Sequence, residues 1–290
     1  MSGSNKKRMI LIPIDFTEIT IVALDQAVNM AKVIDAEITI VNVAEDYGFF
    51  NKYISNSDAA EHKKDTEKKL RELVEERTAS GITIHTMTAH GKIYEKINEV
   101  AEMIGATLIL MGTSGTLGLM KFIGSNTLRV IRESKVPVIS VKGQEIDHGL
   151  SSILIPLDLT KETKEKVAKA IWLSKLYGNA RIDIVSIGTS SDSFLKNKVK
   201  RQEQQVRSFL KGKGIKTTHK MIIDTKGKSI AQVIIDYATE VNAGLIMIMT
   251  QQESDITEMF IGSSAQAIIN GSEIPVMSVV PGNHKYEVAL

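Results

Sequence analysis

Glycines cluster after an apolar run in the first half of the chain, in a pattern that could hold a phosphate group. The run 108–111 has the length and composition of a buried parallel strand. Glycines follow it at Gly112, Gly115 and Gly118, and Gly124-Ser125 then precedes a predicted helix at 126–134. Glycines let a backbone approach a ligand closely, and a helix start offers free N–H groups and a positive dipole end. The alternative is a surface loop that binds nothing, and this stretch alone favours neither interpretation.

The segments that must position this stretch alternate between strand and helix patterns. Apolar strand patterns are predicted at 9–15, 37–43, 82–89, 108–111 and 136–141. Segments whose apolar residues recur at helical spacing lie between these strands. Strands that alternate with helices imply right-handed βαβ units and a parallel sheet covered on both faces. Asp15 ends the first strand. Its carboxylate either faces a ligand or caps the following helix, and the accompanying glycines favour the ligand.

The same order of segments starts again after a polar stretch, 143–151, that is predicted to be a linker. Ile153–Asp158 repeats the first strand, including its proline and its terminal aspartate. Further matches recur at one constant offset, such as Ile123-Gly-Ser125 with Ile261-Gly-Ser263, and Pro137-Val138 with Pro275-Val276. This repetition predicts a duplication, with domains at 1–143 and 151–290.

The two halves differ where the chemistry is expected. At the same offset the glycines and their counterparts are Gly112 and Thr250, Gly115 and Glu253, and Gly118 and Ile256. Side chains, one of them acidic, would take the room and the positive potential that a polyphosphate needs. The sequence therefore predicts a nucleotide in the first domain and none in the second.

Composition excludes several classes of site. The chain has no cysteine, which excludes disulfides, thiolate metal sites and a cysteine nucleophile. Its formal net charge of +2 gives no electrostatic case for nucleic acid or an acidic membrane as a partner. The apolar run after the polar N-terminus stops at Pro13, too short for a signal peptide or a membrane span. We therefore expect a cytoplasmic protein.

A lysine- and arginine-rich segment, 196–216, is the main competing signal. It could form a nucleic-acid patch, but it lacks interleaved aromatic residues, and Phe194 and Phe209 fit the buried stripe of a helix. A solvated helix face is the favoured interpretation. The six histidines lack paired metal-ligand spacing, so no metal site is predicted. No serine lies in a Gly-x-Ser-x-Gly elbow, so no catalytic residue is predicted either.

Four features together resemble the universal stress protein family in its tandem form. They are the strand-Pro-x-Asp opening, the Gly-x2-Gly spacing after the fourth strand, the Gly-Ser pair beyond it, and the closing Pro-Val strand. The resemblance spans Met9 to Val280. It implies an α/β fold of two repeated open-sheet domains, of the adenine nucleotide alpha hydrolase-like type. Each domain would hold a five-stranded parallel sheet, order 3-2-1-4-5, flanked by helices.

The resemblance also implies a set of residues around a nucleotide. In ATP-binding members, the residue at the position of Asp15 lies near the base and ribose, and the backbone near Val43 meets adenine. Gly112, Gly115, Gly124, Ser125 and the adjoining Asn126 would surround the ribose and phosphates. Any Mg²⁺ or Mn²⁺ would be held mainly by phosphate oxygens.

One departure from the family concerns the spacing of the phosphate residues. The family places nine residues between the second glycine and the Gly-Ser pair, whereas eight separate Gly115 from Gly124 here. The predicted function is a stress-response regulator that binds ATP in its first domain, with ligand-dependent order in 112–125 as the signal. The alternatives are slow ATP hydrolysis at the same site and a nucleotide-free interaction module, which the shorter spacing favours.

The fifth strands, 136–141 and 274–279, are predicted to lie at sheet edges. In the family that strand makes dimer contacts. The resemblance therefore implies a pseudo-dimer of the two halves within one chain, and a homodimer of two chains is a further expectation.

Overall fold

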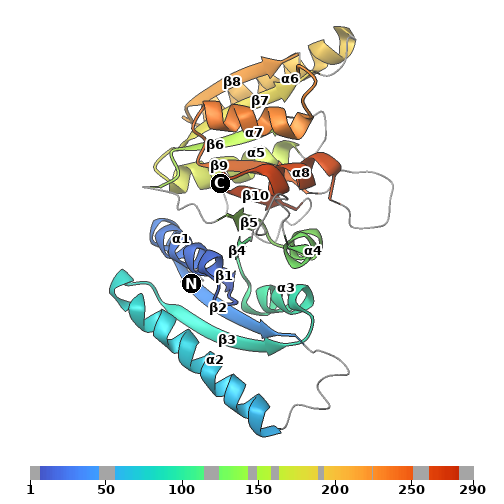
Figure 1. The fold of residues 1–290 in the computed structure, drawn as a ribbon. Coiled ribbons are helices and arrows are strands. Elements are labelled where there is room, and N and C mark those ends of the chain that lie inside the picture. The colour runs from blue at the N-terminus through green and yellow to red at the C-terminus, as the bar shows by residue number, and fades with distance from the viewer. Residues whose placement is uncertain are drawn as a thin grey trace.

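The computed structural model describes residues 7–45, 56–113, 124–142, 149–157, 163–188, 193–223, 225–250 and 261–280. Strands and helices alternate along the whole chain, because short β-branched runs alternate with amphipathic segments. Figure 1 shows the two halves one above the other, with their strands side by side where the halves meet.

The first half holds five strands and four helices in its described residues. Their bounds are β1 (Arg8–Pro13), α1 (Glu18–Ile34), β2 (Ala36–Ala44), α2 (Asn56–Glu76), β3 (Ile84–His90), α3 (Ile93–Ile104), β4 (Leu108–Gly112), α4 (Ser125–Glu133) and β5 (Val138–Val141). A single 3₁₀ turn, Thr78–Ser80, follows α2.

The second half repeats this series in its described residues. Its elements are β6 (Ser152–Leu157), α5 (Thr163–Leu176), β7 (Arg181–Ile187), α6 (Ser193–Gly212), β8 (Thr217–Ile222), α7 (Ile230–Glu240), β9 (Leu245–Met249), α8 (Ser263–Gly271) and β10 (Val276–Val279).

All the strands belong to one ten-stranded sheet of order β3-β2-β1-β4-β5-β10-β9-β6-β7-β8. Each half has the order 3-2-1-4-5 with parallel pairing, which confirms the predicted fold class. The halves join where β5 pairs antiparallel with β10, with Ile139 opposite Met277. This junction is buried: Val138 and Val276 are at most 1% exposed.

Helices cover both faces of the sheet and form two apolar cores. One core is built from α1, α2, α5 and α6 with residues of the strands they cover, and the other from α3, α4, α7 and α8. Both cores run through both halves. Within the described ranges, none of the helices combines the length and apolarity needed to cross a bilayer.

The prediction for the aromatic residues of α6 is wrong. Phe194 is 68% exposed and Phe209 is 49% exposed, so neither belongs to a buried stripe. The side chains that α6 buries include Val206 and Leu210. With about 3.6 residues per turn, Phe209 points roughly a quarter-turn away from Leu210, so an apolar residue near the stripe still reaches solvent.

Candidate functional site

The predicted site residues that the structure describes lie along the carboxyl edge of the first half of the sheet. Strand β1 pairs with β2 on one side and with β4 on the other. The strand order therefore reverses direction between β1 and β4. Open α/β sheets bind ligands at such a switch point, outside the carboxyl ends of the strands. Asp15 follows β1, Val43 lies near the end of β2 and Gly112 ends β4.

The start of α4 lies at the same edge. Since β4 and β5 are parallel, α4 must run back across the sheet and begin at the carboxyl end. The helix begins at Ser125 after the cap residue Gly124, whose φ of −54° and ψ of 142° turn the chain into it. The structure therefore brings Asp15, Gly112 and Gly124 to one edge, while Gly115 lies outside the described residues.

Asp15 is fixed by hydrogen bonds to the first turn of α1. Its Oδ1 accepts from the Thr17 N–H at 3.0 Å, from the Thr17 hydroxyl at 2.6 Å and from the Thr20 hydroxyl at 2.9 Å. Partial burial opposes ionisation, but these hydrogen bonds outweigh it and lower the pKa of Asp15 below its ordinary value. The carboxylate is thus ionised at neutral pH, and its hydrogen bonds hold Thr17, the N-cap residue of α1, and Thr20 in the first turn.

The turn after Asp15 has an unusual backbone. Phe16 has a φ of 66°, in the left-handed region that bulky residues rarely adopt. The Phe16 ring packs against the core of α1 and α2, and the Lys69 ammonium lies 5.8 Å from its centroid. Packing of the ring offsets the strain, and the turn leaves Asp15 exposed at the sheet edge.

Gly112 has a structural reason to be glycine. A Cβ at this position would lie 2.7 Å from the Ile19 carbonyl oxygen, closer than real Cβ contacts. The start of α1 therefore occupies the space in which a side chain at position 112 would lie. This contact also joins the end of β4 to the helix turn that holds Asp15.

The first turn of α4 is open to solvent. Gly124 and Ser125 are exposed, Asn126 is partly exposed, and Gly124 has open space where a Cβ would be. The N-cap residue is a glycine, and within the described residues no capping side chain bonds the first N–H groups of the helix. Such an end attracts an anion through its N–H groups and the helix dipole.

Val43 has a mixed environment. Its partly buried side chain packs against the core of α3 and α4, and its backbone pairs with Ala89 of β3. Beside it, the Asn42 amide donates to the Ile14 carbonyl at 2.8 Å and ties the ends of β1 and β2 together.

Strand register corrects the predicted correspondence between the halves. Val141 of β5 pairs with Gly112, and its counterpart Val279 of β10 pairs with Met249. Gly112 therefore matches Met249, and Thr113 matches Thr250. The offset changes within the next loop, which has ten residues at 114–123 and eleven at 251–261.

The second half has a buried lysine at its own carboxyl edge. Lys166 of α5 is 2% exposed, and its Nζ donates to the Pro156 carbonyl at the end of β6 at 2.5 Å. The series of buried positions in the two helices places Lys166 at the position of Ala23, because Leu24, Ala27 and Val28 of α1 then match Val167, Ala170 and Ile171 of α5. Sequence reasoning missed Lys166, although its spacing from Ala170 and Leu173 puts it on the apolar face of α5. Asp158, the counterpart of Asp15, lies outside the described residues.

The described part of the chain offers little for a metal ion. His, Asp and Glu side chains form no group of three or more there that could bind one.

Comparison with known proteins identifies the repeated unit. The profile of the universal stress protein family matches residues 7–142 and again residues 150–280. The chain belongs to the universal stress protein family. Its two copies of the family domain coincide with the two halves of the sheet.

Curated family members match about half of the chain. Universal stress protein MJ0531 of Methanocaldococcus jannaschii is 33% identical over 148 residues, which are 49% of this chain and 85% of that protein. Universal stress protein YxiE of Bacillus subtilis is 28% identical over 143 residues, 46% of this chain and 97% of the relative. Each is thus similar in length to one domain.

A solved structure matches the tandem arrangement. A universal stress protein from Archaeoglobus fulgidus superposes with a TM-score of 0.77 at 21% identity, covering 96% of this chain and 100% of that one. At this identity the match supports the fold, including the second domain.

Proposed function

We propose that this universal stress protein binds ATP at the carboxyl edge of its first domain and acts as a ligand-linked regulator in the stress response. The observation that carries the proposal is the exposed first turn of α4, which begins at Gly124 without a side-chain cap at the switch-point edge. Its N–H groups suit a phosphate group.

The surroundings of α4 support the same assignment. Asp15 presents an ionised carboxylate just after β1, at the same edge of the sheet, where a ribose hydroxyl could donate to it. Gly115 and Gly118 precede Gly124 in the sequence, and glycines have no side chain that would take the room a phosphate needs. Mg²⁺ or Mn²⁺ would arrive with the phosphates and be held mainly by their oxygens.

The second domain is proposed not to bind ATP. It keeps the helix start, because Gly262 caps α8 with φ −56° and ψ 144°, close to the values at Gly124. It lacks glycines between β9 and Gly262, and it buries the Lys166 ammonium at the edge. We therefore expect one nucleotide per chain.

A calorimetric titration of the full chain with MgATP tests the proposal. The wild type is expected to bind one equivalent. Gly124→Asp is expected to weaken binding at least roughly tenfold, because the new carboxylate would bond the first N–H groups and repel phosphate. Aspartate is also a favourable cap, so the variant should keep its helix and its fold.

Gly262→Asp is the matched control. It introduces the same charge at a cap of the same geometry, and like Gly124 it has open space around the new Cβ. We expect its affinity and stoichiometry to equal those of the wild type. Binding of two equivalents per chain would contradict the proposal that only the first domain binds ATP. A folded wild type that binds no ATP would contradict ATP as the ligand.

A regulatory role requires that the two ligand states differ in their affinity for a partner. The predicted switch, 112–125, lies largely outside the described residues. Limited proteolysis with and without MgATP checks it, since cleavage within this segment should slow on binding in the wild type and not in Gly124→Asp.

A further inference from the structure

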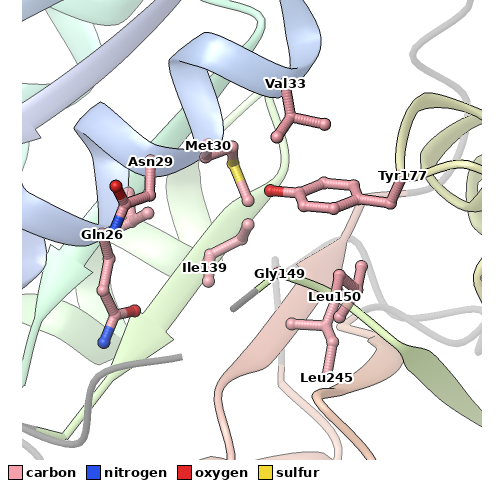
Figure 2. Close-up of a pocket in the computed structure, with 10 residues that line it drawn as sticks. Gln26, Asn29, Met30, Val33, Ile139, Gly149, Leu150, Tyr177 and Leu245 are labelled. Carbon is pink, nitrogen blue, oxygen red and sulfur yellow. The ribbon is translucent and has the colours of Figure 1, made fainter. Parts of the chain in front are cut away.

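A cavity of about 310 Å³ lies between the two halves of the molecule. The first half lines it with the C-terminal part of α1 and with residues of β4 and β5. The second half contributes Gly149 and Leu150 before β6, Tyr177 after α5, and Leu245 of β9. Figure 2 shows these residues facing one another across the space. None of them belongs to the proposed nucleotide site.

The walls of this interdomain cavity are mostly apolar. The apolar side chains are Met30, Val33, Leu110, Ile139, Leu150 and Leu245. Polar groups come from Gln26, Asn29 and Tyr177. Among the described residues that line the space there is no Asp, Glu, Lys, Arg or His. A charged ligand would therefore lose its hydration without gaining an ionic partner, which is costly.

Tyr177 gives the cavity a directed polar group. Its ring extends from the second half, and the hydroxyl points toward Met30 on α1 (Figure 2). Burial raises the pKa of Tyr177 to about 12, so the hydroxyl is neutral at physiological pH and can donate or accept one hydrogen bond.

The volume limits the size of an occupant. At ~30 Å³ per molecule in the liquid, the space is equivalent to roughly ten waters, or to a bicyclic aromatic molecule. Ligand cavities in proteins begin at about this size and are lined mainly by apolar side chains with a few polar groups.

We propose that the interdomain cavity binds a small, uncharged, largely apolar molecule whose one hydrogen-bonding group faces Tyr177. Because both domains supply its walls, the ligand binds only while the domains are docked and stabilises that arrangement. This site is separate from the nucleotide site, and its test does not depend on ATP binding.

A pair of probes of equal size but different charge tests the proposal. 2-Naphthamide is neutral and 2-naphthoate carries a carboxylate, and each is titrated into the full-length protein by calorimetry. The amide should bind at least roughly tenfold more tightly than the carboxylate, since the described lining residues offer the charge no partner. Equal affinity would overturn the requirement for a neutral ligand, and binding of neither would show a hydrated cavity only.

A substitution in the cavity wall and a matched control test whether the probe binds in this cavity. Val33 is 41% exposed and lines the cavity, so Val33→Trp should fill the opening and weaken naphthamide binding at least tenfold. The control is Met103→Trp on α3, where Met103 is 63% exposed and lies outside the cavity. Equal affinity of Val33→Trp and the wild type would overturn the assignment.

Tyr177→Phe keeps the ring and removes the hydroxyl. It should weaken the amide roughly twofold to tenfold, the usual net value of one hydrogen bond, and leave the weak naphthoate binding unchanged. Circular dichroism and thermal unfolding of each variant establish that it is folded. If Val33→Trp fails to fold, the affinity of Tyr177→Phe for the amide is the remaining test of the site. An affinity equal to that of the wild type would overturn the role of the hydroxyl.

Discussion

The carboxyl edges of the two domains begin alike and then diverge. Thr113 donates to the Val141 carbonyl through its N–H at 2.8 Å and its hydroxyl at 3.0 Å. Thr250 makes the same two bonds to Val279, at 3.1 and 3.2 Å. Both threonines are 1% exposed. The groups that end the fourth strand and hold it to the fifth are thus repeated in both domains.

The differences lie on either side of this shared bond. Gly112, against which α1 packs, becomes Met249, and Ala23 on the helix becomes Lys166. The following loop is one residue longer in the second domain. The hydrogen bonds that join the fourth and fifth strands are kept, while residues at the carboxyl edge change, as expected if only one of the two edges binds a nucleotide.

The amino edges of the domains differ as well. Strand register makes Glu37 of β2 the counterpart of Arg181 of β7. Glu37 pairs with His85 at 2.9 Å and Lys7 at 3.3 Å at the surface. Arg181 instead pairs with Asp183, a carboxylate that is fully buried. At matching positions of the amino edge, the first domain therefore has an exposed ion pair and the second has an ion pair with a buried carboxylate.

The largest expected effect comes from breaking the buried pair. Arg181 bonds both Asp183 oxygens, at 2.7 and 2.9 Å, and this hydrogen bonding raises the pKa of the guanidinium. Arg181→Ala would leave the buried Asp183 carboxylate without its cation and with the Thr218 hydroxyl as a remaining donor. Because the Arg181 side chain is 39% exposed, we expect less than for a fully buried pair, a loss of about 2–4 kcal/mol in the free energy of unfolding, measured by urea denaturation.

Glu37→Ala is the matched change in the first domain. Its partners are exposed, so we expect a cost below about 1 kcal/mol. Similar costs for the two variants would mean that the amino edges are energetically equivalent, and the contrast drawn from burial would be wrong.

A smaller effect is expected from adding one methyl group at the carboxyl edge. Gly112→Ala places a Cβ against the Ile19 carbonyl, so α1 or β4 must shift. We expect a loss of about 1–3 kcal/mol in the free energy of unfolding, as for overpacked cores.

Gly124→Ala serves as the comparison, because nothing lies within 4 Å of a Cβ there. Its cost should stay within about 1 kcal/mol, the effect of a poorer helix cap. If Gly112→Ala proved as mild as Gly124→Ala, Gly112 would be explained by a ligand and not by the packing of α1.

Much of the fold could be predicted because it depends on local patterns. The helix predicted at 126–134 matches α4, Ser125–Glu133, to within one residue at each end, and the strand order that the family resemblance implied is the order found in each half. The error in the repeat came from the loop: a constant offset cannot show where one residue is inserted. Only the pairing of Val279 with Met249 located it.

The candidate site was less predictable because its residues depend on contacts between elements. The sequence placed Asp15 at the strand end, but the three bonds to its Oδ1 require the geometry of the α1 turn. The contact of Gly112 with Ile19 and the burial of Lys166 arise only when helix and sheet pack. A glycine or lysine in the sequence does not distinguish such packing from a ligand contact.

The smallest expected effect concerns the charge of Asp15. Its pKa in the folded state lies below the ordinary value of about 3.9, so its ionised form stabilises the fold above that pH. This contribution is lost as the pH falls through the lowered pKa. Asp15→Asn should therefore cost roughly 0.5 kcal/mol at pH 7, given its exposure, and the difference should shrink below about pH 4.

Urea denaturation of both proteins between pH 7 and pH 3 measures this difference, and a gap that stays constant with pH would contradict the role of the charge. The same variant separates the two roles that Asp15 can have. If Asp15→Asn loses stability at pH 7 and still binds MgATP with wild-type affinity, the carboxylate serves α1 alone. If the variant loses much more free energy of MgATP binding than free energy of unfolding, the carboxylate also contacts the ligand. The carboxyl edge of the first domain would then differ from that of the second in function as well as in shape.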